Sequence, residues 1–146
     1  MADKIRITQV LSNLVANAIN YTQPKGHISI LAKVIHDEKR EAKDYIQIAV
    51  KDTGEGIPKD ALGHLFTKFF RVSGILEQGS KGTGLGLFIS KTIMMLHNGD
   101  IWAESELGKG STFTFIIPVA SEQQIQSAQA PTTETEKHGI ILNPQR

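Results

Sequence analysis

Three alternate glycines, Gly82, Gly84 and Gly86, stand directly before a segment with helical spacing in the stretch KGTGLGLFISKTI. A glycine inside a helix costs roughly 0.5–1 kcal/mol relative to alanine, so this pattern needs a reason stronger than helix propensity. A glycine-rich entry into a helix exposes backbone N–H groups and the positive end of the helix dipole, which suit phosphate oxygens. A flexible hinge would explain the same glycines, and this segment alone leaves both interpretations open.

The segment fits neither of the two common nucleotide-binding loops. A Walker A loop needs Ser or Thr after its Gly-Lys pair, but Gly110 follows Gly108 and Lys109 here. A Rossmann loop needs a preceding strand and a third glycine, and Leu87 occupies that third position. The glycines therefore need another explanation.

Two further segments carry polar groups suited to a ligand. DTGEGI, residues 52–57, places an acid at a strand end before two alternate glycines, although Asp and Gly are also ordinary in a strand-to-helix turn. In NLVANAINYT, Asn13, Asn17 and Asn20 fall on one margin of a predicted helix. Amide oxygens suit Mg²⁺, which keeps several waters and is otherwise held by phosphates. A solvated helix margin is the alternative for the asparagines.

The composition excludes several classes of function. The 146 residues carry 16 Lys and Arg against 15 Asp and Glu, so the charge balance indicates neither a nucleic-acid nor a membrane surface. The absence of cysteine excludes a disulfide framework, a thiolate metal site and a cysteine nucleophile, and it fits a reducing compartment. The chain has no apolar run of about 18 residues and no signal-peptide pattern. We therefore expect a soluble cytoplasmic protein.

The elements that must position these groups follow from hydrophobic periodicity. Long amphipathic helices are predicted from Asp3 to about Tyr21 and over 84–97, with a short helix over 59–65. Strands are predicted over 27–36, 45–52, 100–106 and 111–119. We therefore predict an α/β (α+β) two-layer sandwich, with the helices packed on one face of a mixed, mostly antiparallel sheet.

The composition changes after Val119 to Ser, Gln, Thr, Pro and Ala, with too few large apolar residues to maintain a fold. We therefore assign residues 1–119 to one domain and predict that residues 120–146 form a disordered C-terminal tail. The apolar run from Ile140 to Leu142 is the exception, and either a docked segment or a frayed end would accommodate it.

Taken in order, these segments resemble the catalytic ATP-binding domain of two-component sensor histidine kinases, within the GHKL ATPase superfamily. The resemblance extends from about Asp3 to Val119. It rests on an N box (NLVANAINYT), a glycine box (DTGEGI), an F box (LFTKFFR), GTGLGL and GKGSTF. Each motif is weak alone, but their occurrence in this order makes coincidence improbable.

The resemblance implies a set of catalytic, phosphate-binding and metal-binding residues. Asn17 would bind Mg²⁺, Asn13 would help to order phosphate or water, and Arg71 would reach the terminal phosphates. The amides of the glycine-rich segment, at Gly84, Leu85, Gly86 and Leu87, would line the phosphates. Residues 72–83 would form an ATP lid, which includes Lys81, Gly82 and Thr83. The family usually has a lysine where this chain has Asn20, so Lys81 or Arg71 would have to supply the missing cation.

The resemblance also implies an adenine pocket. Asp52 would accept a hydrogen bond from the exocyclic amine, Tyr21 would lie along the ring, and Ile57 would pack on it. Gly56 would allow the base to approach the backbone. The remaining nucleotide-binding candidates are Gly54 in the glycine box, Phe66 in the F box and Thr112, which would support the pocket from its strand.

The position one helical turn before Asn17 bears on the class of enzyme. GHKL relatives that hydrolyse ATP, and the anti-sigma serine kinases, place a glutamate there as general base, whereas this chain has Asn13. An amide cannot take a proton near neutral pH. A histidine acceptor needs no such base, because neutral imidazole already offers a nucleophilic nitrogen. We therefore expect a protein-histidine kinase domain that binds ATP and Mg²⁺ and donates the γ-phosphate.

None of the five histidines lies in the His-Glu context of the family's phosphoacceptor. The resemblance implies that the acceptor lies on a dimerisation domain of the parent kinase, outside this chain, with a response regulator downstream. We expect a monomeric isolated domain without nucleic-acid or membrane contact, cytoplasmic whether or not the parent is anchored in a membrane. A nucleotide-binding interaction module without phosphotransfer, as in degenerate kinases, remains the alternative.

Overall fold

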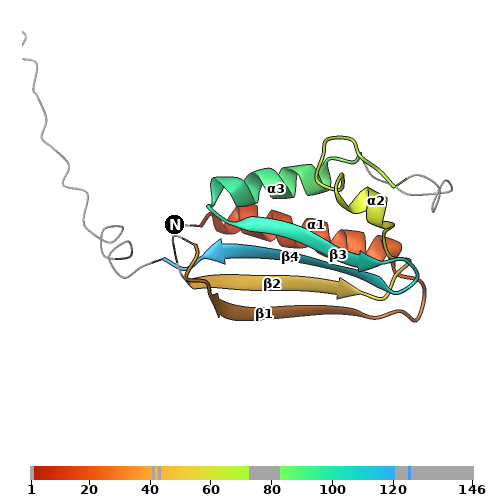
Figure 1. The fold of residues 1–146 in the computed structure, drawn as a ribbon, viewed down its shortest axis with the longest axis horizontal. Coiled ribbons are helices and arrows are strands. Elements are labelled where there is room, and N and C mark those ends of the chain that lie inside the picture. Colours follow the sequence, from red (N-terminus) through yellow and green to blue (C-terminus); the bar gives the residue numbers. More distant parts are fainter. Residues whose placement is uncertain (1, 41, 43, 73–82, 121–124, 126–146) are drawn as a thin grey trace, which may run out of the picture.

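The computed structural model describes residues 2–40, 42, 44–72, 83–120 and 125. These residues form two layers, a sheet with helices on one of its faces (Figure 1). In chain order the elements are α1 (Lys4–Tyr21), β1 (Ile28–His36), β2 (Asp44–Asp52), α2 (Lys59–Leu62), α3 (Gly86–Leu96), β3 (Asp100–Glu106) and β4 (Gly110–Pro118). The predicted fold class and order of elements are confirmed.

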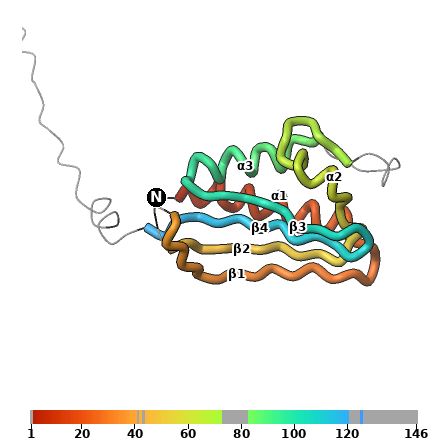
Figure 2. The backbone as a smooth tube through the Cα atoms, in the orientation of Figure 1, coloured from red at the N-terminus to blue at the C-terminus, as the bar shows by residue number. Residues whose placement is uncertain are grey.

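The four strands lie side by side in the order β1-β2-β4-β3 (Figure 2). All three pairings are antiparallel, so the part of the chain that the structure describes contains no parallel pair of a mixed sheet. β1–β2 and β3–β4 are hairpins, in which consecutive strands pair antiparallel. β2 and β4 thereby become the central strands.

The core lies between the central strands and the two long helices. Val10, Leu14 and Ala18 recur at helical spacing on one face of α1 and are buried. They belong to one apolar cluster with residues of the other layer, such as Val50 of β2 and Phe115 of β4. α1 begins where it does because the carboxylate of Asp3 accepts from the backbone N–H groups of Ile5 and Arg6, at 2.9 and 3.2 Å.

Element boundaries differ from the predictions where glycine or a left-handed residue intervenes. α3 begins at Gly86 rather than at residue 84, because Gly84 has a φ of +69°, which a helix cannot include. α2 ends at Leu62, before Gly63, and is shorter than predicted. The predicted lid falls mostly on residues 73–82 and the predicted tail mostly beyond residue 120, both outside the described residues. No helix among the described residues is long and apolar enough to cross a membrane.

The loop between β1 and β2 covers part of the sheet's second face. The Arg40 guanidinium lies 5.7 Å from the ring centroid of Tyr45 and forms ion pairs with Asp37 and Asp100, at 3.2 and 3.4 Å. Tyr45 is buried beneath this guanidinium, and Thr114 and Ile116 of β4 are buried on the same face of the sheet. The second strand was predicted to have one covered and one wet face, and Lys51 is exposed as expected. The β1–β2 loop nevertheless covers the solvent-facing side of the sheet at the beginning of β2, where Tyr45 lies.

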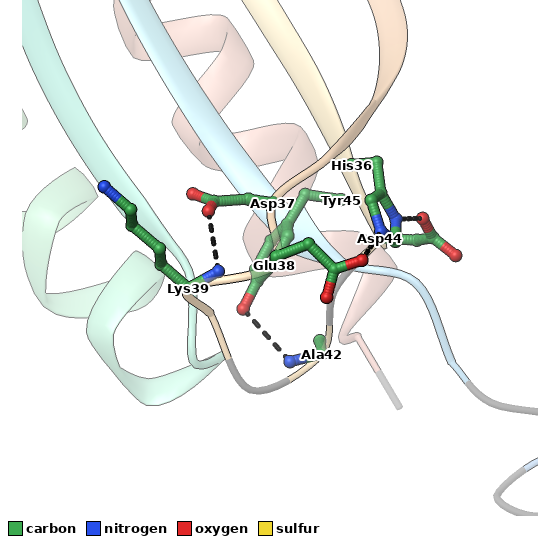
Figure 3. A network of polar contacts seen from close by, with 7 residues as sticks. All are labelled: His36, Asp37, Glu38, Lys39, Ala42, Asp44 and Tyr45. Atoms are coloured by element: carbon green, nitrogen blue, oxygen red, sulfur yellow. Dashed lines mark hydrogen bonds and ion pairs between the residues drawn. The ribbon is translucent and has the colours of Figure 1, made fainter.

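A histidine between two carboxylates holds the beginning of the same loop (Figure 3). Nδ1 of His36 lies 2.6 Å from Oδ1 of Asp44, and Nε2 lies 2.8 Å from Oε1 of Glu38. The hydrogen bond to Asp44, and then that to Glu38, raises the pKa of His36 above 6.5. The protonated imidazolium is therefore the form that best fits this end of the β1–β2 hairpin.

This pair of contacts predicts a pH-dependent contribution to stability. Because the folded-state pKa is raised, the contribution is present below the unfolded pKa of 6.5 and is lost as pH rises through the folded value. We expect the difference in free energy of unfolding between the natural chain and His36→Gln to be larger at about pH 5.5 than at about pH 9. Urea denaturation at both pH values measures it, and a difference that grows with pH would contradict the assignment.

Candidate functional site

A cavity of about 300 Å³ opens where β2 ends and β4 begins. Its walls come from the last turns of α1, the glycine box, the segment from Leu65 to Val72 and the start of α3. α2 and the start of α3 lie near the same end of the sheet, on the right in Figure 1. The residues expected at a ligand site that line this cavity are Asn17, Tyr21, Asp52, Gly56, Ile57, Arg71, Thr83, Gly84, Gly86 and Leu87.

Asp52 is the carboxylate in the cavity wall that is fixed by backbone donors. It is only 4% exposed, and its Oδ1 accepts from the N–H of Gly54 at 2.8 Å and of Ser111 at 3.3 Å. Its Oδ2 has no hydrogen-bond partner among the described residues. One oxygen therefore orients the carboxylate, and the other remains for a donor on a ligand.

Three of the glycines are needed because the protein packs against its own backbone. A Cβ at Gly54 would overlap the carbonyl oxygen of Tyr21, and one at Gly56 would overlap that of Glu106. A Cβ at Gly84 would lie 2.9 Å from the Cα of Phe69. These close approaches join the glycine box to α1 and to the β3–β4 turn, and the start of α3 to the F box. They are sufficient to explain the missing side chains, and Gly56 and Gly84 also line the cavity.

Gly86 is different from these three glycines. A Cβ there would be 3.8 Å from the amide of Asn13, an ordinary van der Waals distance. Packing of the described residues therefore does not require glycine at the first position of α3, where the N–H groups of a helix lack intrahelical partners. The glycines of this segment therefore differ in role, since Gly84 permits close packing of the backbone and Gly86 leaves room at the cavity.

Asn13 connects the two long helices. Its Nδ2 donates to the carbonyl oxygen of Gly86 and to Oγ of Ser90, both at 3.2 Å. Asn13 is not among the residues that line the cavity, although the resemblance implied a phosphate or water contact for it. The contacts give it a positioning role, because they fix the start of α3 against α1.

Asn17 and Asn20, by contrast, do line the cavity. The residues that the structure describes contain no group of three or more His, Cys, Asp or Glu that could hold a metal ion. A metal here would thus need the Asn17 amide oxygen together with ligands from the substrate and water. That donor set is chemically suited to Mg²⁺, which prefers oxygen ligands and retains waters.

The F box supplies the remaining wall. Leu65, Phe70, Arg71 and Val72 line the cavity, and Arg71 is exposed. Phe66 does not line it and instead packs against the core, with Nζ of Lys91 5.7 Å from its ring centroid. Arg71 and the N-terminal end of α3 place positive potential at the same side of the cavity wall.

Several predicted residues lie away from the cavity. Thr112 is a correction, because it pairs with Lys51 and points to the opposite face from its neighbour Ser111, which pairs with Asp52 and lines the cavity. Leu85, at the N-cap position of α3, and Gly54, whose N–H donates to Asp52, do not line the cavity. Lys81 and Gly82 fall outside the described residues.

The sequence interpretation also missed residues that line the cavity. Ser111 could have been found from the alternation of STFTFIIPV, which puts it on the same face as Phe113 and Phe115. Glu55 had no such signal. Its Oε1 accepts from Nε2 of Gln23 at 2.9 Å, while its Oε2 is buried without a hydrogen-bond partner among the described residues. The other missed residues are the apolar Leu65, Phe70 and Phe113, whereas Val72, which also lines the cavity, is the first residue of the predicted lid.

Comparison with known proteins gives one consistent family. Residues 2–121 match the family of histidine kinase-, DNA gyrase B- and HSP90-like ATPases. The sensor histidine kinase WalK of Bacillus subtilis is 42% identical over 122 residues, which cover 84% of this chain and 19% of WalK. The adaptive-response sensory kinase SasA of Synechococcus elongatus is 44% identical over 118 residues, 81% of this chain and 28% of SasA. The chain thus spans less than a third of these relatives.

Solved structures agree with the sequence matches. The catalytic domain of histidine kinase ThkA, in a nucleotide-free form, superposes with a TM-score of 0.64 at 36% identity over 80% of this chain and 68% of that one. Full-length ShkA in complex with AMPPNP gives a TM-score of 0.60 at 28% identity, over 80% of this chain and 22% of that one.

The two kinds of glycine predict opposite effects of the same substitution. Gly84→Ala should lower the free energy of unfolding by about 1 kcal/mol or more, because alanine must adopt a positive φ and displace the Phe69 backbone. Gly86→Ala should be neutral or stabilising by up to about 1 kcal/mol, because alanine favours the helix. Chemical denaturation of both variants measures this, and equal destabilisation would contradict the distinction.

Proposed function

Because the chain belongs to the family of histidine kinase-, DNA gyrase B- and HSP90-like ATPases, we propose that it is the ATP-binding catalytic domain of a sensor histidine kinase. It binds Mg-ATP and donates the γ-phosphate to a histidine on the dimerisation domain of its parent protein. The parent then passes the phosphate to a response regulator in the cytoplasm. The named relatives are sensor kinases of which this chain spans only a part, so its acceptor is expected on a different segment.

The observation that carries the proposal is the buried Asp52 carboxylate in the cavity wall. Two backbone N–H groups hold Oδ1, which leaves Oδ2 as an acceptor beside apolar residues such as Ile57 and Phe113. An adenine ring offers a matching combination, since it has apolar faces and an exocyclic amine that donates. Tyr21 lines the same cavity and supplies an aromatic surface.

The phosphates would lie toward the start of α3. The helix N-terminus presents N–H groups and positive potential, and the absence of a side chain at Gly86 permits a close approach. Arg71 adds a full positive charge to the cavity wall. Asn17 would hold Mg²⁺, which when bound would neutralise charge on the phosphate oxygens.

Phosphoryl transfer to a histidine does not require a general base from this chain. Neutral imidazole can attack without losing a proton first, so the absence of a carboxylate at Asn13 does not prevent the reaction. The chain's own residues would act by positioning the γ-phosphate and stabilising its charge. The hydrogen bonds from Asn13 contribute indirectly, because they fix α3, and so its N–H groups, relative to Asn17.

Asp52→Asn tests the adenine contact. Asparagine can retain the oxygen that accepts from Gly54 and Ser111, but its NH₂ group would face the adenine amine, so two donors would meet. We expect ATP affinity to fall by roughly 1.5–3 kcal/mol, about a tenfold to hundredfold rise in Kd. Calorimetric titration measures it, with Asp60→Asn, an exposed acid on α2, as the matched control. Unchanged affinity would remove Asp52 from the site.

Asn17→Ala tests the metal contact. The loss of ATP affinity should be large in the presence of Mg²⁺ and small with excess chelator, since the amide acts on the nucleotide through the ion. Ser12→Ala, at an exposed position of the same helix, should change neither. An equal loss with and without Mg²⁺ would indicate damage to α1 in place of a lost metal ligand.

Transfer in trans tests the activity itself. The isolated chain should bind labelled ATP without labelling itself, because none of its histidines lies in the acceptor context. Addition of the parent's dimerisation domain should give a label on that partner that is labile in acid and stable in alkali, as phosphohistidine is. Labelling should be slow, because diffusion replaces the covalent tether. Strong self-labelling would contradict the proposal, and binding without any transfer would favour the interaction module.

A further inference from the structure

The two edges of the sheet are protected very differently. β3 carries Asp100, Glu104 and Glu106 along one edge, and α2 and α3 pack against it. Charged side chains and covering elements are the usual means by which proteins keep a sheet edge from pairing. β1, at the other edge, has Lys33 as its only acidic or basic side chain apart from His36 at its end.

β1 also exposes apolar side chains on both of its faces. Ile30 and Val34 are 51% and 69% exposed on the face that carries the helices, and Leu31 is 64% exposed on the other. The strand pairs with β2 one to one over its nine residues, so no bulge twists its edge away. Half of its backbone N–H and C=O groups point away from β2. Such an edge is suited to accepting a further strand.

We propose that the C-terminal segment His138–Asn143 of this same chain docks on the outer edge of β1 as an additional antiparallel strand. This segment, HGIILN, contains the only run of three large apolar residues beyond Val119. Alternation in a strand puts Ile141 on one face and Ile140 and Leu142 on the other, which matches an edge that is apolar on both faces. The family match ends at residue 121, so the docked strand is an addition to the family's domain.

The position at which the chain leaves the sheet supports this occupant. The N–H of Val119, just after β4, donates to the carbonyl oxygen of Asp44 at 2.9 Å, and Asp44 pairs with His36 at the end of β1. The chain therefore leaves at the end of the sheet toward which β1 runs. A segment that turns back along β1 from there is antiparallel to it, as are the other pairs of this sheet.

The connecting segment is long enough for this path. β4 and the outer side of β1 are two to three strand spacings apart, about 10–15 Å. Residues 120–137 can span up to about 60 Å, so they reach any part of β1, which is about 30 Å long. The covalent connection also keeps the segment at a high effective concentration, which a second molecule would not share in dilute solution.

Hydrogen exchange of the whole chain tests the proposal from the tail side. Ile141→Asp should undock the segment and speed exchange of the outward amides of β1 by about tenfold, which corresponds to a docked population of about nine-tenths in the natural chain. Thr133→Asp introduces the same charge into the tail outside the segment and should leave β1 unchanged. Both substitutions lie beyond residue 121, where the match to the family's domain ends, so both variants should fold. Identical exchange of β1 in the natural chain and Ile141→Asp would overturn the proposal.

The reciprocal experiment changes β1 and measures hydrogen exchange in the C-terminal segment. Val34→Asp should speed exchange in residues 138–143, whereas Leu107→Asp, at another exposed apolar residue, in the β3–β4 turn, should not. All measurements are repeated over a tenfold range of protein concentration, with sedimentation of the same samples. Protection that does not change with concentration supports the intramolecular strand. Protection that rises together with a dimer would overturn it and identify a second copy as the occupant.

Discussion

The Asp52 carboxylate joins the turn that follows β2 to a strand that begins far along the chain. It stands at the end of β2, and its Oδ1 accepts from the glycine box at Gly54 and from the start of β4 at Ser111. A buried N–H that loses its acceptor costs about 1–3 kcal/mol, so this one oxygen keeps both segments in place. The second oxygen then faces a cavity whose shape the same contacts have set. In the proposed function, the same side chain would therefore serve both the fold and the ligand.

Polar contacts between α1 and α3 are a second constraint on the site. Asn13 donates twice to the first turns of α3, and at the other end His97 accepts from the N–H of Asp3 at 3.0 Å while its Nδ1–H donates to the Ile93 carbonyl at 2.7 Å. Both ends of the α1–α3 pair are thus joined by polar contacts as well as by the core. The start of α3 and Asn17 cannot shift independently, which is the preorganisation that binding a metal and a polyphosphate together requires.

The sequence predicted what periodicity and local chemistry determine. The long helices, the four strands and most of the polar groups around the cavity follow from apolar spacing and from short motifs. What it could not predict depends on contacts between segments far apart in the chain. Gly56 is glycine because Glu106 passes against it, and Ser111 rather than Thr112 faces the cavity because of its register with Asp52. Similarly, nothing local indicates that Arg40 would cross the sheet to Asp100 and bury Tyr45.

The arrangement of the sheet separates the cavity from the edge available for docking. The cavity is lined from α1, β2, β4, the glycine box, the F box and the start of α3, and β1 contributes no lining residue. An added strand on β1 would therefore leave the ligand contacts unchanged and act only through β2, to which β1 is paired from Asp44 to Asp52. Because that pairing ends at Asp52 itself, restraining β1 also restrains the strand that carries the key carboxylate. Any influence of the tail on ligand binding would then appear as a change in the order of β2 and not as a new contact.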